Sequence, residues 1–202
     1  DIEPSPNTDP HKMIETITME YNNGSITTEG PTNLTWIPTN KHIATPSAPA
    51  PVQDALTEYY YGNSFRHYCD IINNTFETLT ASLKISVGSV LDDLIAPKMI
   101  WNDDKQTAEI IAQQEFFDWD NTNVVNIYFN RALYGKLTSL PALKTYGASD
   151  GKIYKIYMKS DYNTKVLSLD LNGDGTGAQN FIKTSQEYST ISNWTPISSI
   201  VF

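Results

Sequence analysis

Short segments in which apolar and polar residues alternate are the feature that most constrains the fold of this chain. Met13 to Tyr21, Val124 to Asn130 and Lys152 to Lys159 each fit a strand, and Asn, Asp or Gly residues mark a turn beside each one. Thr78 to Val87 has the clearest alternation, and Gly88 ends it. We therefore expect many short strands joined by tight turns.

Segments that fit helices are few and short. Ser89 to Ile95 fits a capped helix that stops before Pro97, and Arg131 to Leu140 fits a helix of two or three turns. Val52 to Tyr61 fits the start of another. The alternation of strand and helix that marks a parallel sheet is absent. The sequence therefore predicts a mainly β protein, either an antiparallel β-sandwich or a lipocalin-like barrel, with a few short helices.

The chain of 202 residues fits one domain with a short polar leader. Residues 1–12 (DIEPSPNTDPHK) contain three prolines and are expected to form a flexible tether. Residues 13–202 are expected to form a single β-rich domain. Within it, residues 38–51 (PTNKHIATPSAPAP) are too rich in proline to join a sheet, so we expect a long loop there.

Charge and cysteine content exclude several classes of protein. The formal net charge of -9 repels phosphate backbones, so no nucleic-acid partner is expected. A single cysteine, Cys69, rules out an intramolecular disulfide. The chain has no run of apolar residues long enough for a transmembrane helix. It starts at Asp1 without Met, which we interpret as a mature form whose leader has been removed.

The segment from Asp170 to Gly177 (DLNGDGTG) places oxygen-bearing side chains at alternate positions between glycines. Asp170, Asn172, Asp174 and Thr176 match the first ligand positions of a calcium-binding loop, so Ca²⁺ is the cofactor that they suggest. The position where such a loop has its closing carboxylate is Phe181. The alternative is a glycine-rich turn between two strands, without a metal ion.

Aromatic residues near turns are the candidates for ligand binding. Tyr60 lies within three consecutive tyrosines, which cannot all face the same side of a strand or helix. Trp36, Trp101 and Trp194 lie near turns. Exposed rings of this kind stack on sugars or anchor a protein partner. The alternative is that these rings cover the ends of the hydrophobic core.

The polar leader DIEPSPNTDP, the short strands rich in Tyr and Asn, and the Asp170–Gly175 loop together resemble exported lipoproteins of the Bacteroidetes. This resemblance implies a β-sandwich or lipocalin-like fold in the cell envelope, either in the periplasm or at the cell surface. It also implies that the leader is a tether following a lipidated cysteine. That cysteine is not in this chain, so the lipid anchor would have been lost with it.

These observations lead to three hypotheses about function. The first is a non-enzymatic binding or adhesion module of the cell envelope, whose ligand is a glycan or a protein at the cell surface. The second is a hydrolase that acts on glycans through a pair of carboxylates. The third is a structural or interaction subunit of a surface assembly, which would use an exposed strand edge to bind its partner.

Overall fold

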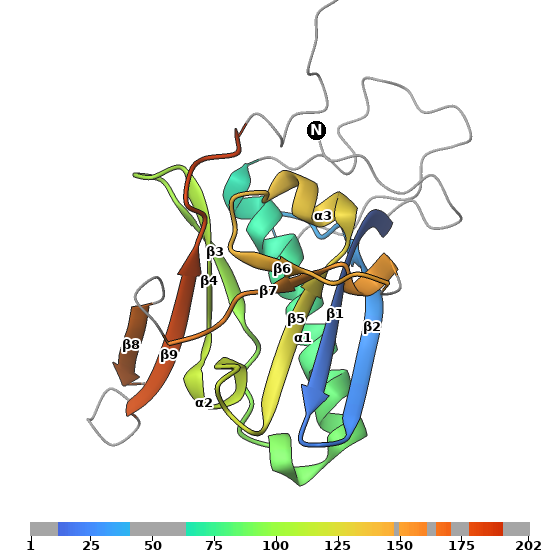
Figure 1. The fold of residues 1–202 in the computed structure, drawn as a ribbon. Coiled ribbons are helices and arrows are strands. Elements are labelled where there is room, and N and C mark those ends of the chain that lie inside the picture. Colours follow the sequence, from blue (N-terminus) through green and yellow to red (C-terminus); the bar gives the residue numbers. More distant parts are fainter. Residues whose placement is uncertain (1–11, 41–63, 148–149, 161–164, 171–177, 192–202) are drawn as a thin grey trace, which may run out of the picture.

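Two antiparallel β-sheets make up most of the structure in the computed structural model, which describes residues 12–40, 64–147, 150–160, 165–170 and 178–191 (Figure 1). The prediction of a mainly β protein with antiparallel sheets is therefore confirmed. The tether at residues 1–12 and the loop at residues 38–51 lie outside the described residues, apart from Lys12 and residues 38–40.

The first sheet is built around the hairpin that Asn22, Asn23 and Gly24 predict. Among the described residues its strand order is β2-β1-β5-β7-β6, and all pairings are antiparallel. The strands are β1 (Lys12–Asn22), β2 (Ile26–Thr35), β5 (Val124–Phe129), β6 (Ala142–Lys144) and β7 (Tyr154–Ile156). β7 is shorter than the predicted strand at Lys152 to Lys159.

The second sheet has the order β3-β4-β9-β8 in the described part of the chain, again antiparallel throughout. Its strands are β3 (Lys98–Asn102), β4 (Thr107–Gln113), β8 (Lys165–Asp170) and β9 (Ala178–Ser185). The helical elements are α1 (Phe65–Val87), η1 (Ser89–Leu91), α2 (Gln114–Phe117), α3 (Arg131–Lys136) and η2 (Asp150–Lys152).

The prediction of a strand at Thr78 to Val87 is wrong, because this segment is the second half of the long helix α1. Leu79 and Leu83 are buried, as the predicted strand requires, but Ala81 and Ile85 of the same expected face are exposed. Leucines four residues apart fit the two-residue period of a strand and also the 3.6-residue period of a helix. The local pattern therefore could not separate the two. The predicted helix at Val52 to Tyr61 lies outside the described residues.

Capping residues define both ends of α1. The side chain of Ser64 accepts a hydrogen bond from the backbone N–H of His67 at 3.1 Å. At the other end, Gly88 adopts a positive φ of 87°, and its N–H donates to the carbonyl oxygen of Lys84 at 2.8 Å. The helix therefore begins and ends where its own sequence provides the caps.

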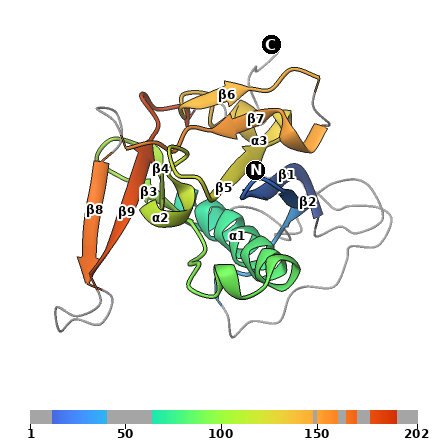
Figure 2. The ribbon, with the colours of Figure 1, turned by 60° about the horizontal axis from the view of Figure 1, so that its bottom comes forward.

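Helix α1 fills the space between the two sheets and forms the centre of the core (Figure 2). It contacts β1 and β2 of the first sheet and β3 of the second. Phe76 on α1 also stacks on Phe129 of β5 in the first sheet, with the ring centroids 6.4 Å apart. The helix thus joins two sheets that share no strand among the described residues.

A bulge in β2 depends on Gly30. Ile17 pairs with Thr32 but Met19 pairs with Glu29, so β2 carries one residue more than β1 over this stretch. Gly30 has a φ of 103°, and a Cβ atom there would lie 2.8 Å from the carbonyl oxygen of Ile17. Both the dihedral angle and the close backbone approach therefore require glycine.

We expect Gly30→Ala to destabilise the fold more than Gly24→Ala. Both glycines have a positive φ, but a Cβ at Gly24 would meet nothing within 4 Å. Gly24→Ala should cost about 1–2 kcal/mol through backbone strain alone, and Gly30→Ala about 1 kcal/mol or more beyond that. Urea unfolding of the two variants measures the difference, and equal midpoints would contradict the proposed backbone clash.

Candidate functional site

The candidate site begins at Glu20, which lies on the face of β1 that points away from α1. Met19 faces the helix, because its sulfur accepts a hydrogen bond from the Thr80 hydroxyl on α1. Successive side chains of a strand point to opposite faces, so Glu20 lies on the other side of the sheet. The residue is nevertheless buried. A buried carboxylate needs partners, and the strand register supplies them.

The register of the first sheet places Thr28 and Asn126 on either side of Glu20. Glu20 pairs directly with Thr28 on β2 and with Asn126 on β5. Tyr128, two residues along β5, points to the same face. Lys152 comes from η2, which packs over this face of the sheet. Four separate elements therefore meet at one carboxylate.

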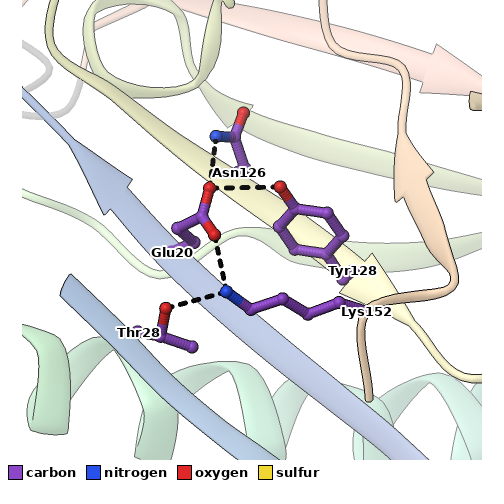
Figure 3. A network of polar contacts seen from close by, with 5 residues as sticks. All are labelled: Glu20, Thr28, Asn126, Tyr128 and Lys152. Atoms are coloured by element: carbon purple, nitrogen blue, oxygen red, sulfur yellow. Dashed lines mark hydrogen bonds and ion pairs between the residues drawn. The ribbon is translucent and has the colours of Figure 1, made fainter. Parts of the chain in front are cut away.

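Glu20 uses both carboxylate oxygens (Figure 3). Its Oε2 accepts a hydrogen bond from Lys152 Nζ at 2.6 Å, and that Nζ also donates to Thr28 Oγ1 at 2.9 Å. Its Oε1 accepts from the Tyr128 hydroxyl at 3.1 Å and from Asn126 Nδ2 at 3.3 Å. We call these five residues the Glu20 network. Charge and hydrogen bonds both compensate the burial of the carboxylate.

Close packing of η2 on the sheet positions Lys152. A Cβ atom added to Gly151 would lie 2.7 Å from Cβ of Pro31 and 3.0 Å from Oγ1 of Thr18. Only the absence of a side chain at Gly151 lets the backbone approach this closely. The bulge that contains Pro31 and the neighbouring Gly151 thus place the lysine beside the carboxylate.

The network shifts the proton affinities of its members. Burial raises the pKa of Glu20, but the hydrogen bond and charge of Lys152, with the hydrogen bonds of Tyr128 and Asn126, bring it below its ordinary value. Burial, with the charge and hydrogen bond of Glu20, raises the pKa of Tyr128. Burial lowers the pKa of Lys155, and the charge of Glu20 opposes that shift. At neutral pH the Glu20 network therefore holds a charged pair.

Two further buried glutamates pair with lysines among the described residues. Glu15 on β1 contacts Lys136 on α3 at 2.7 Å. Glu109 on β4 contacts Lys183 on β9 at 2.8 Å and accepts a hydrogen bond from Asn102 Nδ2 at 3.1 Å. Burial raises the pKa of Glu109, but its hydrogen bonds with Lys183 and Asn102 and the lysine charge outweigh burial, so the pKa is lowered. Each pair joins different elements of the fold.

The structure brings two of the predicted aromatic residues to the start of α1. Trp36 is buried, with its ring edge-on to His67 at a centroid distance of 6.0 Å. Trp101 on β3 is partly buried and stacks on Phe65 at 4.4 Å. The other two, Tyr60 and Trp194, lie outside the described residues. Ligand binding by the four predicted residues stays a prediction.

The predicted calcium loop also stays a prediction. Asp170 is the last residue of β8, and Asn172, Asp174 and Thr176 lie outside the described residues. Within the part of the chain that the structure describes, no group of three His, Cys, Asp or Glu side chains could hold a metal ion. None of the helices described is both long enough and apolar enough to cross a membrane.

Sequence reasoning missed the Glu20 network. Glu20 occupies a polar position in the alternating strand Met13 to Tyr21, where a side chain is expected to face water. Its burial depends on Lys152, which is 132 residues away in the sequence. A hint was present in the Asp150-Gly151 turn, since glycine allows a loop to lie directly on a sheet.

Removing the lysine should cost stability because it leaves a buried carboxylate without its counter-charge. We expect Lys152→Met to lower the free energy of unfolding by about 1–3 kcal/mol. The matched control is Lys159→Met, which breaks the more exposed pair with Asp120 and should cost about 1 kcal/mol or less. Urea unfolding at neutral pH compares the two, and equal losses would show that the Glu20 pair contributes no more than a surface contact.

Acid should weaken the fold through Glu20 and Glu109. Their folded pKa values lie below the ordinary value of 4.5, so the stability that they contribute is present above that pH. It is lost as the pH falls through the folded pKa. We expect the double variant Glu20→Gln/Glu109→Gln to lose less stability than the wild type between about pH 5 and pH 3. Urea midpoints across this range test it, and parallel profiles would exclude the two carboxylates as the source.

Comparison with known proteins identifies the family. The family model for the Sputnik minor capsid protein V18/19 matches residues 1–202. A chain in the cryo-EM structure of the Sputnik virophage has a similar fold, with a TM-score of 0.72 and 24% sequence identity. The match covers 96% of this chain and 52% of that one, so this chain spans about half the length of the Sputnik chain. No curated protein matches it.

The family match corrects the resemblance to exported lipoproteins of the Bacteroidetes, which is wrong. The expected location in the periplasm or at the cell surface and the lipid anchor were implied by that resemblance, and they are withdrawn with it. A polar leader with prolines, Tyr-rich strands and a glycine-rich loop are traits of composition that unrelated β proteins share. The match over residues 1–202 shows that the chain belongs to the Sputnik minor capsid protein V18/19 family.

Proposed function

We propose that this chain is a structural subunit of a virophage capsid, and that it acts by binding other capsid proteins. The observation that carries this proposal is the family match over residues 1–202. The fold shared with a chain of the Sputnik virophage structure supports it. The function is then mechanical: the subunit must hold its shape while its surface binds neighbours.

The internal organisation of the chain is consistent with this role. Buried Glu–Lys pairs link β1 to α3, β1 to η2 and β4 to β9. A buried charge pair has a strong requirement for geometry, so each pair fixes the relative positions of the elements that it joins. The family match favours the structural-subunit hypothesis over glycan binding as the main function.

The test of this proposal is the protein composition of purified particles. We expect mass spectrometry of particles from the virus that encodes the chain to detect the full-length protein. We also expect the protein to stay with the particle after protease treatment and a high-salt wash. Chemical cross-linking of intact particles should join it to other capsid proteins. A protein found in infected cells but absent from washed particles would contradict the proposal.

Exposed apolar side chains are where the partners are expected to bind. The large ones among the described residues are Ile14, Ile26, Ile85, Val90, Ile95, Leu143, Tyr146 and Tyr188. Ile85 on α1 and Tyr146 after β6 are the most exposed, at 85% each. Subunit interfaces bury such side chains at their centres and leave charged residues at the rim.

We expect Ile85→Asp and Tyr146→Asp to reduce incorporation into particles without unfolding the protein, because both side chains are in water in the isolated chain. Thr78→Asp is the matched control, since it adds the same charge to an exposed position of α1 without removing a large apolar side chain. Incorporation is measured by mass spectrometry of particles, and folding by urea unfolding. Normal incorporation of both variants would exclude these two positions as interface centres.

A further inference from the structure

One carboxylate of the fold contacts both an amine and a primary amide. Glu20 Oε2 accepts a hydrogen bond from Lys152 Nζ at 2.6 Å, and Oε1 accepts from Asn126 Nδ2 at 3.3 Å (Figure 3). The Tyr128 hydroxyl donates to Oε1 at 3.1 Å and holds the carboxylate in this orientation. A nucleophile, an amide and an acid–base group therefore meet at one carboxylate, and these are the three kinds of group that acyl transfer needs.

We propose that Lys152 and Asn126 become joined by an intramolecular isopeptide bond, with Glu20 transferring the proton. Nζ of the neutral lysine attacks Cγ of Asn126, the new N–C bond forms, and the bond from Cγ to Nδ2 breaks. One ammonia molecule leaves. No oxidant, reductant or cofactor is consumed, because an amide and an amine become a substituted amide and ammonia.

The two oxygens of Glu20 supply the proton transfers. The ionised carboxylate accepts a proton from the Lys152 ammonium through Oε2, which frees the lone pair of Nζ for the attack. The carboxyl group then donates this proton to Nδ2 of Asn126 as ammonia leaves, and the carboxylate accepts the second proton that Nζ loses when the new amide forms. Because the ion pair is the stable form at neutral pH, the first transfer is uphill, and we expect the bond to form slowly after folding.

The reaction requires the lysine side chain to adopt a less extended rotamer. Figure 3 shows its stem running from beside Tyr128 on β5 to the carboxylate, and Nζ lies 5.7 Å from the centre of the Tyr128 ring. Asn126 lies directly opposite Glu20 in the sheet and is held by the strand. The Lys152 side chain is 25% exposed, so its neighbours do not enclose it on all sides. The proposed reaction requires Nζ to leave Thr28 and move toward Asn126.

A second set of the same residue types provides an internal control. Glu109 contacts Lys183 and Asn102, but the register separates the amine from the amide. Asn102 lies at the level of Thr107 on β4 and Lys183 at the level of Ile111. At about 3.3 Å per residue these levels are about 13 Å apart, so the two side chains reach Glu109 from opposite directions. We expect no bond there.

Intact-mass measurement of the folded, full-length protein tests the proposal. During incubation at neutral pH the mass should fall by about 17 Da, the mass of one ammonia, and a protease digest should yield one linked peptide containing residues 126 and 152. Asn23 and Gly24 lie in an exposed turn where succinimide formation would remove the same mass. The linked peptide, and its persistence in Asn23→Ala, distinguish the two reactions.

Variants test each role. Lys152→Arg keeps the positive charge but is not a nucleophile, so the loss of mass should disappear while urea unfolding shows a folded protein. Lys183→Arg should leave the loss unchanged. Glu20→Gln should slow the reaction. Asn126→Asp should change the loss to about 18 Da, because water replaces ammonia as the leaving group.

A chain that keeps its full mass and yields no linked peptide after prolonged incubation would overturn the proposal. A linked peptide that persists in Lys152→Arg, or one that joins Lys183 to Asn102, would also overturn it. These outcomes are independent of the capsid role, which particle composition decides. If the chain carries the bond but is absent from particles, the isopeptide proposal stands and the capsid proposal fails.

Discussion

The packing of α1 between the two sheets is the constraint on which the other features depend. The sheets share no strand among the described residues, so their inner faces would be exposed without the helix. The buried side chains of α1 recur every three or four residues and cover both faces at once, with Phe76 against Phe129 of β5. Since burial of apolar surface drives folding, this helix determines how the sheets are placed.

The outer face of the first sheet is stabilised by polar contacts as well as by apolar packing. Several of its buried positions are polar, and charge and hydrogen bonds centred on Glu20 satisfy them. Apolar packing tolerates small displacements, whereas a buried carboxylate requires its partners at hydrogen-bonding distance. The same chain therefore combines an apolar interior, which stabilises it, with a polar face that specifies the position of η2. For a protein of a capsid family, a defined shape matters as much as the free energy of folding.

Local sequence signals predicted the first hairpin well and the long helix badly. Asn22, Asn23 and Gly24 identify the first turn, and the strand at Val124 is buried along its whole length. The leucines at positions 79 and 83 fit a helix as well as a strand, and only tertiary contacts on α1 decide between them. The sequence did not reveal the Glu20 network, because its partners lie far apart in the chain and meet only in the folded protein. The resemblance that was drawn from composition alone gave the wrong family.

The contact between Trp36 and His67 has a consequence for the length of the chain between β2 and α1. His67 Nε2 lies 2.7 Å from the carbonyl oxygen of Ile37, so the chain leaves β2 and enters α1 at the same corner of the molecule. A flexible segment that joins two nearby points costs only about 0.6 kcal/mol more when its length is doubled. We therefore expect a change in the number of residues between Asn40 and Ser64 to leave the two sheets and α1 unchanged.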